Sequence, residues 1–106
     1  MTDPFIHVVY FWLREPQNAA HRQLFETSIH RFLNDSLHAG SWHVGAPAGT
    51  GRSVVDNSYT YCLMVTFATA GKQDQYQSEP AHLQFIEEAS HLWERVQVYD
   101  SIAIGS

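Results

Sequence analysis

The sequence predicts an α+β fold in which four strands form an antiparallel sheet and helices cover one of its faces. Three patterns support this prediction. Residues 5–13 are apolar at both alternating sets of positions, which is typical of a strand covered on both faces. Residues 58–68 alternate regularly, as strands do, and apolar residues recur at three- and four-residue steps between residues 16 and 39, which indicates an amphipathic helix.

The amino-terminal third of the chain predicts a strand followed by a long helix. The strand covers Phe5–Leu13, and His7 is the polar exception on one of its faces. Pro16 suits the first turn of a helix, because its fixed φ angle is helical and its missing N–H is not needed there. The apolar repeat continues to Ala39, and Gly40 is expected to cap the carboxyl end of the helix.

The middle of the chain predicts two strands and a loop. Residues 41–45 suit a short strand, and residues 46–57, which contain Pro47, Gly49 and Gly51, suit a loop. In the strand over residues 58–68, one face is expected to carry Tyr59, Tyr61, Leu63, Val65 and Phe67.

The last third predicts a helical turn, a helix and a strand. The turn covers residues 70–78 and carries Tyr76, and Pro80 begins the helix. One side of this helix is expected to carry Leu83, Ile86, Ala89 or Ser90, and Trp93. The final strand covers residues 96–104, with Val96, Val98, Ile102 and Ile104 on one face.

This order of elements predicts the ferredoxin-like βαββαβ arrangement, a four-stranded antiparallel sheet with both helices on one face. The name describes topology and implies no iron. The other face carries aromatic residues such as Tyr10 and Trp12, and no further element of the chain is available to cover it. A second copy packed through this sheet face is the simplest cover, so we expect a homodimer.

Length and composition restrict the class of protein. The 106 residues suit a single domain over residues 1–106. The net charge of −5, with six Lys and Arg against eleven Asp and Glu, offers no basic stripe for nucleic acid. No apolar run approaches the roughly 20 residues that span a bilayer, so no membrane partner is expected and the cytoplasm is the predicted location. The single Cys62 suits a buried, unreactive thiol.

No cofactor or metal is predicted. The chain has seven histidines, but no two of them are spaced i, i+4 as ligands on one helix face would be. The glycine-containing stretch over residues 48–53 lacks the lysine and the strand–loop–helix context of a phosphate loop. A mobile connection, which can also act as a lid, is the preferred interpretation.

Several motifs resemble those of the stress-responsive A/B barrel (Dabb) domain family. They are His7-Val8-Val9 in the first strand, residues 59–67 in the third, and the segment Tyr76, Pro80, His82 and Phe85, followed by Val98-Tyr99-Asp100. The resemblance covers nearly the whole chain. It implies a dimeric α/β barrel built from two ferredoxin-like halves, with a pocket between sheet and helices in each.

The resemblance also implies candidate site residues. One family member, a polyketide cyclase, closes a ring by an aldol reaction with a tyrosine–histidine pair, and Tyr76 and His82 match that pair by motif position. His7 matches a third pocket residue, and Ser28 stands where that enzyme has a pocket tyrosine.

The chemistry of these side chains fits that assignment. A neutral His82 imidazole can remove a proton next to a carbonyl, and the positive end of its helix disfavours the charged form. Tyr76 can donate a hydrogen bond to the developing oxyanion, and His7 can bind a hydroxyl. Apolar walls are expected from Phe11, Phe25 and Phe85, and Ser28 is included as a further binding position.

Three functions stay open from the sequence. The first is a homodimer that binds a small apolar or carbonyl-bearing molecule without chemistry. The second is a cofactor-free acid–base enzyme, of cyclase, lyase or isomerase type, in which Tyr76 and His82 are catalytic. The third is a structural or stress-related dimer without a ligand, in which buried histidine and tyrosine side chains bond only to the protein itself.

Overall fold

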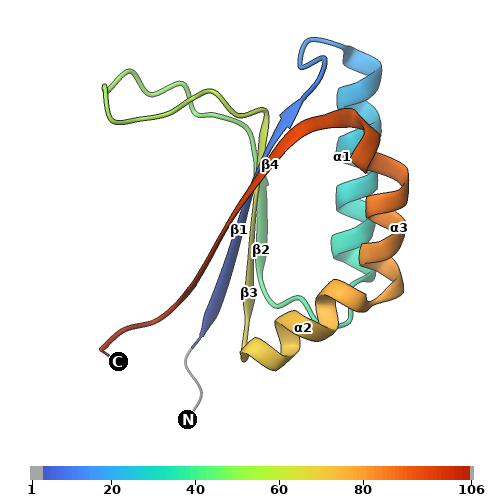
Figure 1. The fold of residues 1–106 in the computed structure, drawn as a ribbon, viewed down its shortest axis with the longest axis vertical. Helices are drawn as coiled ribbons and strands as arrows, with labels where there is room; N and C mark the ends of the chain where they lie inside the picture. The colour runs from blue at the N-terminus through green and yellow to red at the C-terminus, as the bar shows by residue number, and fades with distance from the viewer. Residues whose placement is uncertain (1–3, 106) are drawn as a thin grey trace.

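The computed structural model describes residues 4–105, and its elements follow the predicted order (Figure 1). The first half of the chain contains β1 (Phe5–Leu13), α1 (Ala19–Asp35), β2 (Trp42–Gly45) and β3 (Tyr61–Phe67). The second half contains α2 (Ala70–Ser78), α3 (Pro80–Ala89), the 3-10 turn η1 (Ser90–Leu92) and β4 (Trp93–Ile102). All strand pairs are antiparallel in the order β2-β3-β1-β4, which confirms the ferredoxin-like α+β fold.

The helices and the sheet form two layers. Figure 1 shows the sheet nearly edge-on, with α1 and α3 on one side of it and α2 below them. The segment between β2 and β3 projects from the side of the sheet that carries no helix. No helix within residues 4–105 is long and apolar enough to cross a membrane.

Aromatic side chains form the centre of the core between these layers. Phe25 of α1 has no exposed surface and stacks on Tyr61 of β3, with 4.4 Å between ring centroids and 4° between ring planes. Phe11 of β1 meets Phe25 edge-on at 5.0 Å, and Phe85 of α3 stacks on Phe32 at 5.3 Å. Each such ring buries on the order of 150–250 Å², so this cluster is a large apolar contact between the sheet and the helices α1 and α3.

The first helix is shorter than the sequence predicts at both ends. It begins after Asn18, whose side chain accepts a hydrogen bond from the backbone N–H of His21 at 3.1 Å, so Pro16 lies before the helix. It ends at Ser36, which has extended backbone angles. The predicted cap at Gly40 is therefore wrong.

Gly40 has a different role, since it lies against β3. Its backbone N–H donates to the carbonyl oxygen of Thr66 at 2.8 Å, and a Cβ atom at position 40 would stand 2.6 Å from that oxygen. Close approach of two backbone segments, and not a left-handed cap, explains the glycine.

The predicted apolar face of the last helix is wrong at two positions. Leu83 and Ile86 of that face are 57% and 37% exposed, and Phe85, which was not assigned to it, is buried, so only the predicted burial at Ala89 is confirmed. Trp93 is no longer helical and begins β4, which starts earlier than predicted and ends at Ile102. The third strand begins at Tyr61 instead of Ser58, and its predicted buried face is confirmed at Tyr61, Leu63, Val65 and Phe67.

Replacing Gly40 with alanine is expected to destabilise the protein by about 1–3 kcal/mol, the usual cost of forcing an extra methyl group into a packed site. The added Cβ would meet backbone atoms, which cannot rotate away. The matched control is Gly51→Ala in the loop, where an added Cβ meets nothing within 4 Å. Urea denaturation of both variants checks the prediction, and equal midpoints would contradict it.

Candidate functional site

A cavity of about 270 Å³ lies between the sheet and the helices, next to the aromatic core. Its polar lining groups are His7 of β1, Tyr76 and Gln77 of α2, and His82 of α3. The other lining residues are apolar: Val9, Phe11, Phe32, Leu63, Phe85, Ile86, Trp93, Val96 and Val98. An apolar space with a few polar groups is the usual form of a small-molecule site.

His7 is held by a carboxylate on the neighbouring strand. The strand register places His7 opposite Asp100 of β4, and its Nδ1 lies 2.5 Å from Asp100 Oδ1. A carboxylate only accepts hydrogen bonds, so Nδ1 carries the proton in this contact. The pair therefore fixes the orientation of the imidazole ring, which is 7% exposed and lines the cavity.

Tyr76 and His82 reach the same cavity because the helix is broken between them. In one continuous helix, side chains six residues apart point about 120° away from each other. Here Glu79, between α2 and α3, is extended at φ −70° and ψ 151°, and Pro80 begins the next helix. The break brings the two rings to 5.4 Å between centroids.

The catalytic pair predicted from the sequence is close in space but not directly bonded. Within residues 4–105 no hydrogen bond joins the Tyr76 hydroxyl to His82. The Tyr76 ring also lies 6.0 Å from the His7 ring, so the three groups form one cluster. Their roles in binding or catalysis stay a prediction.

Burial sets the protonation states of this pair. Burial raises the pKa of the Tyr76 phenol, and the nearby Glu79 carboxylate raises it further, so Tyr76 is a neutral hydrogen-bond donor. Burial also lowers the pKa of His82, and the neighbouring His7 adds to this effect, while Glu79 and the Gln77 backbone oppose it. His82 is thus neutral near pH 7, the form that a general base requires.

Two of the residues predicted to bind a ligand lie away from the cavity. Phe25 is wholly enclosed in the core, where it stacks on Tyr61. Ser28 is buried between α1 and α3 and donates a hydrogen bond to Glu88 at 3.2 Å. Neither is among the lining residues, whereas Phe11 and Phe85 are.

Asp100 is the site residue that sequence reasoning did not single out for a role. It interrupts the apolar face of β4 between Val98 and Ile102, just as His7 interrupts the apolar face of β1. Two polar interruptions on strands that pair are a signal for a side-chain contact. Identifying this contact requires the register between the two strands, which the sequence alone does not supply.

No three His, Cys, Asp or Glu side chains gather closely enough to hold a metal ion in the part of the chain that the structure describes. The four-group cluster of His7, Asp100, Tyr76 and His82 instead provides hydrogen-bond donors and acceptors around an apolar space. Such a set can bind and orient a carbonyl or hydroxyl group, and it can move a proton.

The fold and this pocket define a class, that of ferredoxin-like proteins with a cavity between sheet and helices. The sequence model of the Stress responsive A/B Barrel Domain family matches residues 5–103, so the chain belongs to this family. The resemblance in the sequence is thereby confirmed. A comparison with curated proteins gives no match.

Solved structures show the same fold at low sequence identity. A family member from Mesorhizobium loti with a ferredoxin-like fold is 16% identical, with a TM-score of 0.81 over 98% of this chain and 100% of that one. The hydroxynitrile lyase of Passiflora edulis is 17% identical, with a TM-score of 0.79 over 100% and 98% of the two chains. A dimeric ferredoxin-like protein of unknown function from Thermobifida fusca is 11% identical, with a TM-score of 0.79 over 97% and 93%.

The lowered pKa of His82 predicts a specific pH dependence of stability. Below about pH 6.5 the unfolded chain takes up a proton at this residue that the folded protein resists, so the free energy of unfolding falls as pH decreases. The variant His82→Gln lacks this contribution and is expected to lose less stability than the wild type between pH 7 and pH 5.

Urea denaturation at several pH values measures this difference. The same change at the exposed His91 is the control. Parallel pH curves for the wild type and His82→Gln would contradict the predicted direction.

Proposed function

We propose that the protein is a homodimer that binds a small organic molecule in the cavity between sheet and helices. The observation that carries this proposal is the convergence of His7, Tyr76 and His82 on one apolar cavity. Its volume of about 270 Å³ is just below the usual range of ligand pockets, about 300–1,000 Å³, which favours a ligand smaller than most drugs.

The polar groups favour a ligand that carries a carbonyl or hydroxyl oxygen. Tyr76 is kept protonated by burial and offers a donor. His82 Nδ1 is buried and has no hydrogen-bond partner within the described residues. The His82 side chain lines the cavity, so a ligand oxygen there can meet the imidazole ring.

A second candidate is cofactor-free acid–base catalysis on a carbonyl-bearing or aromatic substrate. His82 in its neutral form supports it, because that form can accept a proton near pH 7. The hydroxynitrile lyase shares the fold at 17% identity. This likeness supports a common architecture and does not indicate a particular reaction. In this candidate His82 is the base and Tyr76 stabilises the negative oxygen.

The proposed dimer uses the sheet face that carries no helix. Ile6, Val8, Tyr10 and Trp12 of β1 lie on this face and are only partly covered. Tyr10, Trp12, Tyr59 and Tyr99 also line a hollow of about 410 Å³ there, larger than the cavity beside the core. A second copy would cover both, and the solved neighbour from Thermobifida fusca is described as dimeric.

Acetophenone, with an aromatic ring and one carbonyl, is a suitable probe of the cavity, and ethylbenzene is the matched probe without the oxygen. We expect Tyr76→Phe to weaken acetophenone binding about 2- to 10-fold, the effect of one lost hydrogen bond, and to leave ethylbenzene binding unchanged. Tyr59→Phe, on the open sheet face, is the control variant. Saturation-transfer NMR with competition measures both affinities.

The same probe separates binding from catalysis. Faster exchange of the acetophenone methyl protons in D₂O, abolished by His82→Gln, would favour the enzyme over the binding protein. Binding without exchange supports the first proposal. If neither compound binds, the structural dimer without a ligand is favoured.

The dimer predicts that a charge in the middle of the open face separates the subunits. Val8 lies there on β1, opposite Met64 of β3 and Tyr99 of β4. We expect Val8→Glu to halve the mass measured by light scattering at micromolar concentration, because burying an unpaired carboxylate in the interface is costly. Gln23→Glu on the exposed side of α1 is the control, and a monomeric wild type would contradict the proposal.

A further inference from the structure

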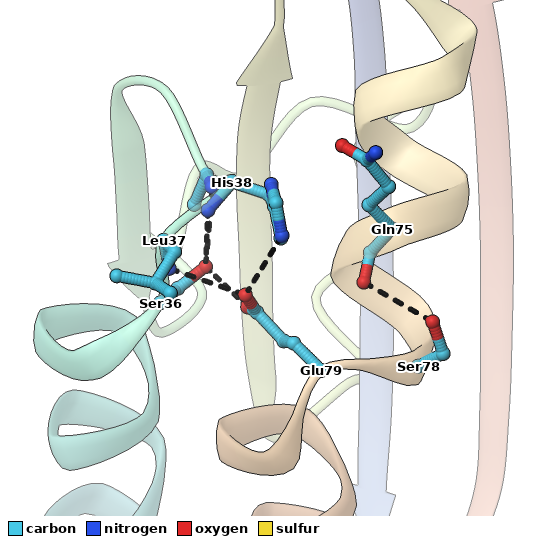
Figure 2. A network of polar contacts seen from close by, with 7 residues as sticks. Ser36, Leu37, His38, Gln75, Ser78 and Glu79 are labelled. Carbon is cyan, nitrogen blue, oxygen red and sulfur yellow. Dashed lines mark hydrogen bonds and ion pairs between the residues drawn. The ribbon is translucent and has the colours of Figure 1, made fainter.

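Glu79, at the break between α2 and α3, is a buried carboxylate outside the cavity lining. It is 6% exposed, and its side chain points away from the two helices toward the segment that follows α1 (Figure 2). One carboxylate oxygen accepts a hydrogen bond from the Ser36 hydroxyl. The other accepts from the backbone N–H of Leu37 at 3.1 Å and lies 3.9 Å from His38 Nε2.

The end of α1 is folded around this carboxylate. Ser36 ends the helix, and its hydroxyl oxygen in turn accepts from the backbone N–H groups of His38 and Ala39, at 3.3 and 3.1 Å. The Ser36 hydroxyl therefore donates one hydrogen bond to Glu79 and accepts two from backbone N–H groups of the turn. A buried carboxylate without partners would be strongly destabilising, so these contacts fix where the α2–α3 break can lie.

The backbone of Glu79 connects the two residues that face the cavity. Its N–H donates to the carbonyl oxygen of Tyr76 at 3.4 Å, at the end of α2. Its carbonyl oxygen accepts from the N–H of His82 at 3.1 Å, at the start of α3. Glu79 stands three residues from each of them, so a movement of Glu79 changes the directions of both side chains.

We propose that Glu79 is a positioning residue for the cavity: its carboxylate anchors the α2–α3 break to the end of α1, holds Tyr76 and His82 toward one space, and acts on both through its charge. This inference extends the proposed function, because it names the residue outside the cavity that determines how the site presents its donor and its base.

The electrostatic contribution has a defined direction. The Glu79 carboxylate raises the pKa of Tyr76 and opposes the lowering of the His82 pKa that burial and His7 cause. The other titratable groups around this cluster are His38 beside Glu79 and Asp100 beside His7. Without the negative charge of Glu79, His82 would be harder to protonate than it is.

The test is an NMR titration of the His82 imidazole in the ligand-free protein. Glu79→Gln keeps the size of the side chain and an oxygen that can accept from Leu37, but it removes the charge, so the pKa of His82 is expected to fall. Glu79→Asp keeps the charge and should retain a higher His82 pKa than Glu79→Gln. Glu87→Gln, at an exposed position on the same helix, is the control for a change in total charge.

The anchoring contribution is tested separately at Ser36. Ser36→Ala removes the hydrogen bond to Glu79 together with the two that the hydroxyl accepts from the turn, and it keeps the Glu79 charge. We expect it to lower the midpoint of thermal unfolding and to shift the side-chain NMR signals of Tyr76 and His82, while Ser53→Ala in the exposed loop does neither.

Two results would overturn the proposal. One is an unchanged His82 pKa in folded Glu79→Gln, and the other is unchanged Tyr76 and His82 signals in Ser36→Ala, a readout that remains if Glu79→Gln fails to fold. Both measurements are made without a ligand. A failure of acetophenone to bind the wild type therefore argues against the proposed function and not against the role of Glu79.

Discussion

The pairing of β1 with strands on both sides is the constraint on which the rest of the structure depends. Alternation along β1 sends His7, Val9, Phe11 and Leu13 toward the helices, and all four are buried. The same strand supplies the core with Phe11 and the cavity with His7. A slip of one residue in the β1–β4 register would separate His7 from Asp100 and turn the apolar face outward, so stability and the candidate site depend on one alignment.

The break between α2 and α3 is the second determinant of the candidate site. It sets the directions of the side chains on either side of it and places a charge close to them. Its sequence signals are visible, since Pro80 lacks the N–H that a continuing helix would need and suits the first turn of a new one. The partner of the break is not visible in the sequence, because Glu79 meets Ser36 and Leu37 from a distant part of the chain. A helix start can be read from neighbouring residues, whereas the residue that anchors it comes from tertiary packing.

The strands could be predicted from alternation because a period of two residues has only two possible faces. The buried sides of the helices were harder to predict, since a repeat of 3.6 residues allows faces that differ by small rotations. In α1 the buried residues Phe25, Ile29, Phe32 and Leu33 belong to the apolar repeat predicted between residues 16 and 39. In α3 the stripe was assigned to Leu83 and Ile86, two positions before and one position after Phe85, and it is the Phe85 ring that packs in the aromatic core.

The positions where apolar patterning failed are also informative about function. Ile86 on α3 and Val96 and Val98 on β4 are 37%, 45% and 42% exposed, although their patterns predict burial, and all three line the cavity. Apolar side chains that the core does not need are a cost unless something covers them. A ligand bound in the cavity would cover these side chains. Their exposure therefore connects the misassigned helix face with the proposed binding function.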